Sequence, residues 1–197
     1  MMSRADILVA GVGGQGTLLA SNILSEIGMR AGYDVKKSDV LGLSVRGGSV
    51  LSHVRWGSDV ASPVVPQGSM THLLAFEPLE ALRGLHLMNH SAQVLCNSQP
   101  IPPVSVSSGD LTYPSMDRVE AQLSKETSGV RIIGATKLAM EMGNPRVTNV
   151  IMLGAFSTYF DIDPQVWLDV VLGGVPEKHA KLNGAAFQAG RDLLAKE

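Results

Sequence analysis

Short apolar runs and helical repeats alternate along the first two thirds of the chain. Apolar runs bounded by glycine, proline or small polar residues predict strands, and apolar positions that recur every three to four residues predict helices. The expected strands are 6–10, 35–40, 49–56, 71–76, 92–97 and 130–133. The expected helices between them are 16–31, one that begins at Glu77, and 115–127. This alternation predicts an α/β fold, a Rossmann-like and mostly parallel sheet with flanking helices.

The last third of the chain has the pattern of helices alone. The expected segments are 136–142, 145–159, 164–172 and 177–195. Asn144 and Asp163 each precede a proline and are the predicted N-caps, because a side-chain oxygen at that position accepts a hydrogen bond from the first turn. We expect a single domain over residues 1–197, with a sheet core over about 1–135 and a helical third over 136–197.

The segment 99–109 interrupts the alternation, because three prolines stand at positions 100, 102 and 103. Proline removes a backbone donor and is incompatible with a helix interior or a central strand. We therefore expect an extended surface connection, or an arm that lies on a partner. A surface loop without a partner is the alternative.

The first expected strand leads directly into Gly11-Val-Gly13-Gly14-Gln15-Gly16, and a helical pattern follows at once. In this context Gly11 permits a tight turn, Gly13 permits close approach of a bound group, and Gly16 allows the helix to pack near the strand. The N–H groups of the first helical turn suit an anion, usually phosphate. These residues, with Gly14 and Gln15, form the candidate binding loop. A tight turn without a ligand is the alternative.

A second glycine-rich loop, 42–48, ends in Arg46-Gly47-Gly48. We expect it to face the first loop across the carboxyl edge of the sheet, where open α/β sheets bind ligands. Arg46 could fork onto a phosphate or carboxylate, or it could form a structural salt bridge. Asp39 is 23 residues beyond Gly16 and is a loose fit for a ribose-binding carboxylate, a role for which Asp34 competes.

Composition excludes several classes of protein. The 197 residues are 45% hydrophobic and have a net charge of −2, which disfavours disorder and a polybasic nucleic-acid surface. No apolar run approaches the roughly 20 residues of a membrane span, and the N-terminus leads directly into a strand, so we expect a soluble, cytoplasmic protein. The single cysteine, Cys96, cannot form an internal disulfide or hold an iron–sulfur cluster and is expected to be a small buried side chain.

Neither a catalytic residue nor a metal site is predicted. His86 and His90 have the spacing of two ligands on one helix face, but the glutamate of the zinc-protease motif and a third ligand are missing, so solvated or capping roles are expected. The nucleophile-elbow and Walker patterns are also absent from the sequence. A nucleotide-type scaffold without its own reactive group suits a subunit whose chemistry is completed elsewhere.

Five motifs, in order along almost the entire chain, resemble the gamma-type subunits of 2-oxoacid:ferredoxin oxidoreductases, most closely the beta subunits of the indolepyruvate type. The motifs lie in 7–16, 46–55, 74–82, 143–155 and 183–191. Related second loops commonly read V-H-G-M-A-Q-R-G-G, and here Leu41 and Val45 stand in place of the histidine and the glutamine. This departure leaves the particular 2-oxoacid open.

The resemblance implies a Rossmann-like subunit of an enzyme that oxidises a 2-oxoacid with coenzyme A, giving acyl-CoA, carbon dioxide and reduced ferredoxin. It places thiamine diphosphate and the iron–sulfur clusters in a larger partner subunit, with coenzyme A at the interface and ferredoxin reached through the complex. The isolated chain is expected to be inactive, and a contact between two copies is also compatible. Two alternatives stay open, a free-standing NAD(P)- or flavin-binding oxidoreductase and a purely structural assembly subunit.

Overall fold

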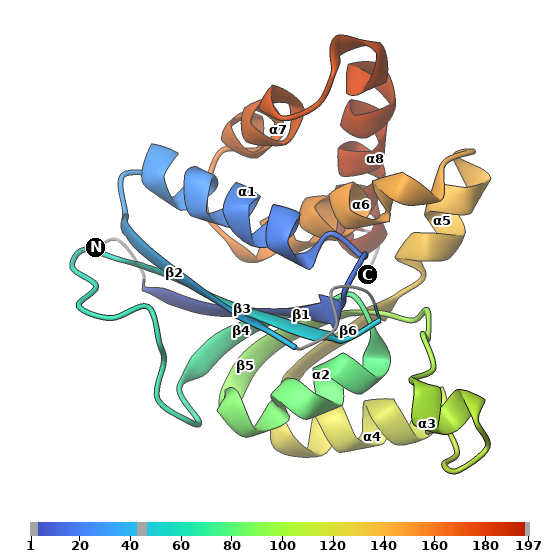
Figure 1. The fold of residues 1–197 in the computed structure, drawn as a ribbon. Helices are drawn as coiled ribbons and strands as arrows, with labels where there is room; N and C mark the ends of the chain where they lie inside the picture. Colours follow the sequence, from blue (N-terminus) through green and yellow to red (C-terminus); the bar gives the residue numbers. More distant parts are fainter. Residues whose placement is uncertain (1–3, 43–46, 196–197) are drawn as a thin grey trace.

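A computed structural model describes residues 4–42 and 47–195 and shows a sheet with helices on both faces (Figure 1). The strands are β1 (Ala5–Val12), β2 (Asp34–Leu41), β3 (Ser49–Gly57), β4 (Met70–Ala75), β5 (Met88–Asn97) and β6 (Gly129–Ile133). They form one six-stranded sheet in the order β2-β3-β1-β4-β5-β6. Only β3 runs against its neighbours, and β1, β4, β5 and β6 pair in parallel. The predicted α/β, mostly parallel sheet is confirmed.

The order of the strands differs from that of a dinucleotide-binding sheet at one position. In that fold the strand after the first helix pairs with the first strand. Here the antiparallel β3 separates β2 from β1, and β2 and β3 form a hairpin whose connection is the second glycine-rich loop. Val12 at the end of β1 pairs with Ser49 at the start of β3. The hairpin therefore brings the second loop beside the first, as predicted, although by an antiparallel route.

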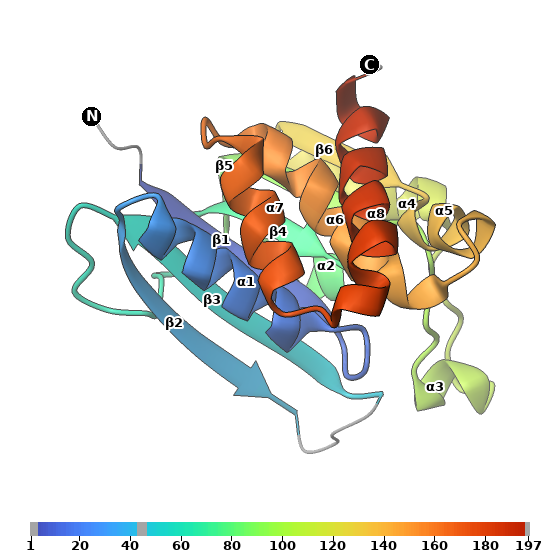
Figure 2. The ribbon, with the colours of Figure 1, turned by 90° about the horizontal axis from the view of Figure 1, so that it is seen from above.

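Helices cover the two faces of the sheet unequally. One face carries α1 (Thr17–Arg30), α6 (Thr148–Phe156), α7 (Pro164–Gly173) and α8 (Glu177–Ala195), which lie across the sheet in Figure 2. The opposite face carries α2 (Pro78–Gly84) and α4 (Met116–Glu126), while α5 (Ala135–Glu141) and the short α3 (Val104–Ser107) lie toward one end (Figure 1). Short 3₁₀ turns occupy Leu85–Leu87, Pro145–Val147 and Ser157–Tyr159. The predicted helical C-terminal third is confirmed.

The two faces have different cores. Under α1 and α7, Trp56, Phe160 and Trp167 pack ring against ring, with centroids 5.0 Å apart for Trp56–Phe160 and 5.8 Å for Phe160–Trp167. The face under α2 and α4 is filled mainly by aliphatic side chains. The helices α6 and α8 approach closely at Gly154, where an added Cβ would lie 2.1 Å from the Phe187 carbonyl oxygen. This contact fixes the C-terminal helices to one another.

Several local predictions are confirmed. Asn144 accepts a hydrogen bond from the Arg146 N–H at 3.0 Å, and Asp163 accepts one from the Gln165 N–H at 2.8 Å, as expected of N-caps. Cys96 is fully buried, and burial raises the pKa of its thiol well above the usual range. None of the helices in the described ranges has the length and apolar character that a membrane crossing requires.

One of three further local predictions is wrong, and the other two are confirmed with a difference in detail. The segment 99–109 contains the helix α3, because Pro103 occupies the position before its first turn, where a missing N–H costs nothing. The expected helix 145–159 is divided into a 3₁₀ turn, α6 and a second 3₁₀ turn. The solvated or capping roles expected of His86 and His90 are confirmed, since both are exposed and their Nδ1 atoms lie 2.9 Å and 3.1 Å from the carbonyl oxygens of Arg83 and Glu126; β5 already begins at Met88, so the two do not share a helix.

Candidate functional site

The first glycine-rich loop has the backbone conformation that its glycines permit. Gly14 and Gly16 have φ angles of 107° and 85°, in the left-handed region where glycine is favoured. Gly11 lies beneath them, and a Cβ there would come within 2.6 Å of the Thr17 hydroxyl oxygen. Gly16 is the N-cap of α1, and no side chain of the described residues caps this end. The start of α1 is therefore free of a competing side-chain acceptor.

Gln15 joins the end of β1 to the end of β4. Its Oε1 accepts a hydrogen bond from the Val12 N–H at 2.8 Å, and its Nε2 donates one to the Phe76 carbonyl oxygen at 3.0 Å. The Gln15 side chain is thus part of the framework of the loop, in addition to lining the space beside it.

The two glycine-rich loops bond directly to each other. The Gly13 N–H donates to the Gly48 carbonyl oxygen at 2.8 Å, and the Gly47 N–H donates to the Gly13 carbonyl oxygen at 3.2 Å. The predicted neighbourhood of the loops is confirmed, and these two N–H groups are already used within the protein. Arg46, the predicted cation of the second loop, lies outside the described residues.

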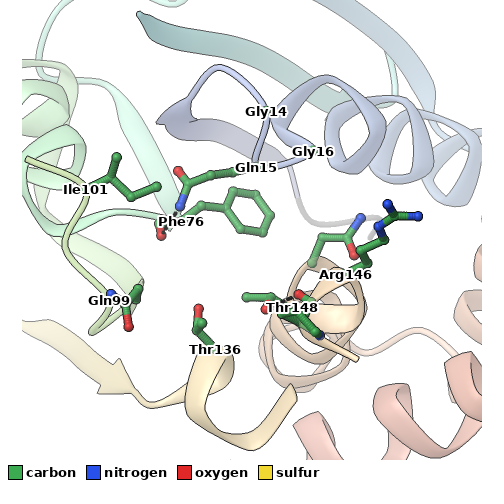
Figure 3. A pocket seen from close by; sticks show the side chains of 11 residues that line it. Gly14, Gln15, Gly16, Phe76, Gln99, Ile101, Thr136, Arg146 and Thr148 are labelled. Carbon is green, nitrogen blue, oxygen red and sulfur yellow. Dashed lines mark hydrogen bonds between the residues drawn. The ribbon is translucent and has the colours of Figure 1, made fainter. Parts of the chain in front are cut away.

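A cavity of about 360 Å³ lies beside Gly14, Gln15 and Gly16 at the carboxyl edge of the sheet (Figure 3). Its other walls come from the residues that follow β4 and β5, from the first turn of α5, and from the 3₁₀ turn Pro145–Val147 and the start of α6 that follows it. They consist of Phe76, Gln99, Ile101, Thr136, Pro145, Arg146, Thr148 and Asn149. The sequence patterns do not predict that these eight residues form a site. The motif 143–155 contained four of them, and only the packing of α6 shows that they face the glycine loop.

The cavity is suited to an anion. Among its described lining residues, Arg146 is the only charged one, and its side chain is exposed. The amide of Asn149 lies beside Gly16, since a Cβ added there would be 3.1 Å from Asn149 Nδ2. The beginning of α1 and the 3₁₀ turn that leads into α6 thus meet at one cavity, and the N-terminus of α1 carries partial positive charge that favours anions. Figure 3 shows Arg146 and Gly16 on the same side of this space.

A buried amide fixes the floor of the cavity. Asn97 is completely buried at the end of β5. Its Nδ2 donates to the Phe76 carbonyl oxygen at 3.2 Å and to the Thr136 hydroxyl at 2.9 Å, and its Oδ1 accepts from the Thr136 N–H at 3.3 Å. The Phe76 carbonyl therefore accepts hydrogen bonds from both Gln15 and Asn97. The ends of three strands and the start of α5 are held by this one network.

A second cavity, also about 360 Å³, lies on the other side of the loop. It is lined by Gly13, Gly14, Gly16, Thr17, Leu18, Leu41, Gly42 and Val50. Leu41, which stands where related loops commonly have histidine, forms part of this apolar wall. Of the predicted loop residues, Gly13, Gly14, Gln15 and Gly16 line one or both cavities, whereas Gly11 supports the turn from below.

The structure gives both ribose candidates other partners. Asp39 bonds to Lys37 Nζ at 2.6 Å and accepts from the Ser52 hydroxyl at 2.6 Å. Burial opposes ionisation of Asp39, but these hydrogen bonds outweigh it and lower its pKa. Asp34 at the start of β2 bonds Lys36 and the Val60 N–H. Because β3 stands between β2 and β1, Asp39 is displaced by about 10 Å, two strand spacings, from the strand that carries the glycine loop.

The described side chains do not form a candidate metal site. Over residues 4–42 and 47–195, no group of three or more His, Cys, Asp and Glu side chains is placed to hold a metal ion.

Known proteins are similar to this one over almost the whole chain. A family model described as pyruvate ferredoxin/flavodoxin oxidoreductase matches residues 6–193. Indolepyruvate oxidoreductase subunit IorB of Thermococcus kodakarensis is 41% identical over 192 residues, which cover 96% of this chain and 95% of the relative. The subunit of the same name from Methanothermobacter thermautotrophicus is 33% identical over 187 residues, covering 94% of this chain and 95% of the relative.

Solved structures share the fold at lower sequence identity. The keto/oxoacid ferredoxin oxidoreductase gamma subunit from Geobacter sulfurreducens has a TM-score of 0.71 at 21% identity, and the match covers 98% of this chain and 99% of that one. The 2-oxoglutarate:ferredoxin oxidoreductase from Magnetococcus marinus, solved with 2-oxoglutarate, coenzyme A and succinyl-CoA bound, has a TM-score of 0.76 at 21% identity. In that case the match covers 100% of this chain and 32% of the longer chain.

Proposed function

Because the chain belongs to the pyruvate ferredoxin/flavodoxin oxidoreductase family, we propose that it binds coenzyme A at its glycine-rich edge within a 2-oxoacid:ferredoxin oxidoreductase. The resemblance found in the sequence motifs is confirmed by the family match and by the named relatives. The chain is thus a subunit of such an oxidoreductase. The observation that carries the more specific proposal is the cavity at the starts of α1 and α6, with Arg146 as its only charged lining residue among those described.

Phosphate groups are the part of coenzyme A that this edge suits best. Helix N-termini and a guanidinium both favour a phosphate, and the guanidinium can donate two parallel hydrogen bonds to it. A cavity of about 360 Å³ accommodates one section of coenzyme A and leaves the rest to extend outward. In this proposal the Gly11–Gly16 loop and Arg146 hold the phosphates, and Arg46, Gly47 and Gly48 complete the site from the neighbouring loop. The Magnetococcus enzyme, which shares the fold, was solved with coenzyme A bound.

The remaining chemistry belongs to a larger subunit in this proposal. Thiamine diphosphate and the iron–sulfur clusters reside there, and electrons leave to ferredoxin through the complex. Two surfaces of this chain are candidates for the contact, the 99–109 arm and the C-terminal helices. The arm carries Val104, which is 83% exposed, and Leu111, which follows it, is 63% exposed. Exposed apolar side chains on a projecting segment are typical of a surface that a partner covers.

The 2-oxoacid is proposed to be an aryl pyruvate. The relatives at 33% to 41% identity are named as subunits of indolepyruvate oxidoreductase. The apolar second cavity, in which Leu41 replaces a polar residue, could also fit an enzyme that accepts a different apolar 2-oxoacid. A panel of indolepyruvate, phenylpyruvate, branched-chain 2-oxoacids and pyruvate separates these substrates.

The proposal is tested by co-expression with the thiamine-binding subunit. We expect 2-oxoacid-dependent and coenzyme A-dependent reduction of a viologen dye only when both chains are present, and an indolepyruvate rate above the pyruvate rate. Activity that does not depend on coenzyme A would contradict the proposed site. Failure to form a complex, together with binding of a nicotinamide or flavin by the isolated chain, would favour the free-standing oxidoreductase. Unchanged kinetics after substitutions in both glycine loops would favour a purely structural subunit.

A further inference from the structure

Two carboxylates are buried in the first turn of α2, just beyond the wall of the cavity. Glu77 and Glu80 are 1% and 2% exposed. A buried carboxylate is strongly unfavourable unless hydrogen bonds satisfy it. Glu80 is bonded by the Ser49 hydroxyl and by Arg83 NH1, each at 2.5 Å. The hydrogen-bond partners of Glu77 are different, and one of them is the N–H of Ile101, a residue that lines the cavity.

Glu77 accepts hydrogen bonds from three separate parts of the chain. Its Oε2 accepts from the Glu80 N–H at 2.9 Å, which caps α2. Its Oε1 accepts from the Ile101 N–H at 3.0 Å and from the Tyr113 hydroxyl. The Tyr113 oxygen in turn accepts from the Leu79 N–H at 3.2 Å. One carboxylate oxygen therefore holds both ends of the segment 101–113.

The held segment begins at a wall of the cavity. Ile101 and Gln99 line it opposite Arg146 and the start of α6 (Figure 3). The Ser98 N–H makes the last backbone bond to the sheet edge, at the Ile133 carbonyl oxygen. Beyond it, the backbone bonds of α3 and its flanks, among the described residues, close within 103–111. Among the described residues, the polar links between this segment and the start of α2 are thus the Glu77 bonds to Ile101 and Tyr113 and the bond from the Leu79 N–H to the Tyr113 hydroxyl.

We propose that Glu77 is a positioning residue for the cavity, holding the Ile101 wall through its bonds to Ile101 and Tyr113 at the place that the bound ligand requires. The inference rests on the proposed function, since the ligand is taken to be coenzyme A. A carboxylate suits the position because two oxygens offer about four acceptor sites, enough for three donors from three directions. Loss of one donor leaves the wall free to shift while the lining side chains stay the same. Because binding is sensitive to such small displacements, affinity is expected to fall.

The test uses Tyr113→Phe in the assembled two-subunit enzyme, with Tyr33→Phe as the matched control. The first change removes the hydroxyl that donates to Glu77 and accepts from the Leu79 N–H, and it keeps the ring. The second removes a hydroxyl from a tyrosine that stacks on Trp56, beneath the other face of the sheet. We expect the KM for coenzyme A to rise severalfold in Tyr113→Phe, up to about tenfold if the whole of one lost bond to a charged group is expressed in binding, with kcat unchanged. Tyr33→Phe is expected to leave both constants unchanged.

A second variant and a second measurement keep the test decisive. Glu77→Gln replaces one acceptor oxygen by a donor and is expected to raise the same KM. Hydrogen exchange of the complex is expected to show faster exchange in a peptide over 99–103 for Tyr113→Phe, although the substitution lies ten residues away. If Tyr113→Phe leaves the KM for coenzyme A unchanged, or lowers kcat alone, the inference is wrong and the proposed function stands. If the parent complex shows no dependence on coenzyme A, both are wrong.

Discussion

The carboxyl edge of the sheet, which lines an open cavity, and the aromatic cluster under α1 and α7, which is buried, are held together in different ways. At the edge, the fully buried Asn97 uses its amide to join Phe76 and Thr136. In the cluster, the indole nitrogens of Trp56 and Trp167 are buried without a hydrogen-bond partner among the described residues, and their rings pack on other rings.

This difference indicates that the edge is suited to positioning a ligand, whereas the aromatic cluster stabilises the fold. Directed hydrogen bonds fix positions to within tenths of an ångström, which a binding site requires. Ring packing fills volume and contributes most of its free energy through burial. Truncation of a ring should therefore lower stability most, whereas nearly isosteric changes at the edge should alter ligand binding.

The largest expected effect is that of Trp167→Ala in the cluster. Trp167 is completely buried and lies 5.8 Å, centroid to centroid, from Phe160. Its removal leaves a large cavity, and we expect the free energy of unfolding to fall by about 3–5 kcal/mol. Urea denaturation of the purified chain, followed by circular dichroism, measures this. A loss below about 1 kcal/mol would show that the cluster is not the main source of stability, because surface changes have effects of that size.

The cluster also makes stability depend on pH. Burial lowers the pKa of His72 from 6.5 to about 4, and its ring packs 4.7 Å from that of Phe160. Because the unfolded chain binds the proton first, the free energy of unfolding falls as the pH falls from about 6.5 to about 4, by at most about 3 kcal/mol. Burial also lowers the pKa of His53, which adds an effect of the same sign.

Urea midpoints at several pH values between 7.5 and 4.5 measure this dependence. The variant His72→Phe keeps a ring in the cluster and is expected to show a shallower fall. A dependence identical in parent and variant would contradict the assignment to His72.

A smaller effect on stability is expected from Gln15→Leu at the edge. The substitution removes the bonds to the Val12 N–H and the Phe76 carbonyl, and the unsatisfied donor costs about 1–3 kcal/mol. The matched control is Gln165→Leu, which loses an exposed bond to Asp169 and should change stability by less than about 0.5 kcal/mol. Thermal unfolding of both variants tests the difference. Equal stabilities would show that the Gln15 bridge does not fix the loop.

The parts of the site that the sequence predicts are those encoded by neighbouring residues. The turn at Gly11–Gly16 follows from a strand, a glycine spacing and a helix within ten residues, and the structure has all three. The helix α3 is not predicted when the three prolines are taken together as helix-breaking residues. Pro103, however, stands immediately before the first turn of the helix. The position of each proline relative to the first turn decides whether it interrupts a helix.

The far wall of the cavity could not be predicted in this way. Arg146 lies 130 residues beyond Gly16, and the two are brought together by the packing of α6. That packing depends on Gly154 and Gly190, where an added Cβ would lie 2.1 Å and 2.0 Å from backbone oxygens of the facing helix. Such contacts follow from the three-dimensional arrangement of helices, and no local pattern of one sequence specifies them.

The proposed binding of coenzyme A between the glycine loop and Arg146 is tested most directly by Arg146→Gln in the assembled enzyme. The matched control is Arg118→Gln, an exposed arginine on α4 at the opposite face. We predict that Arg146→Gln raises the KM for coenzyme A at least about tenfold, through loss of a charge-assisted bond, and leaves the KM for the 2-oxoacid unchanged. Arg118→Gln should change neither constant. Equal KM values for coenzyme A in the two variants and the parent would contradict the claim.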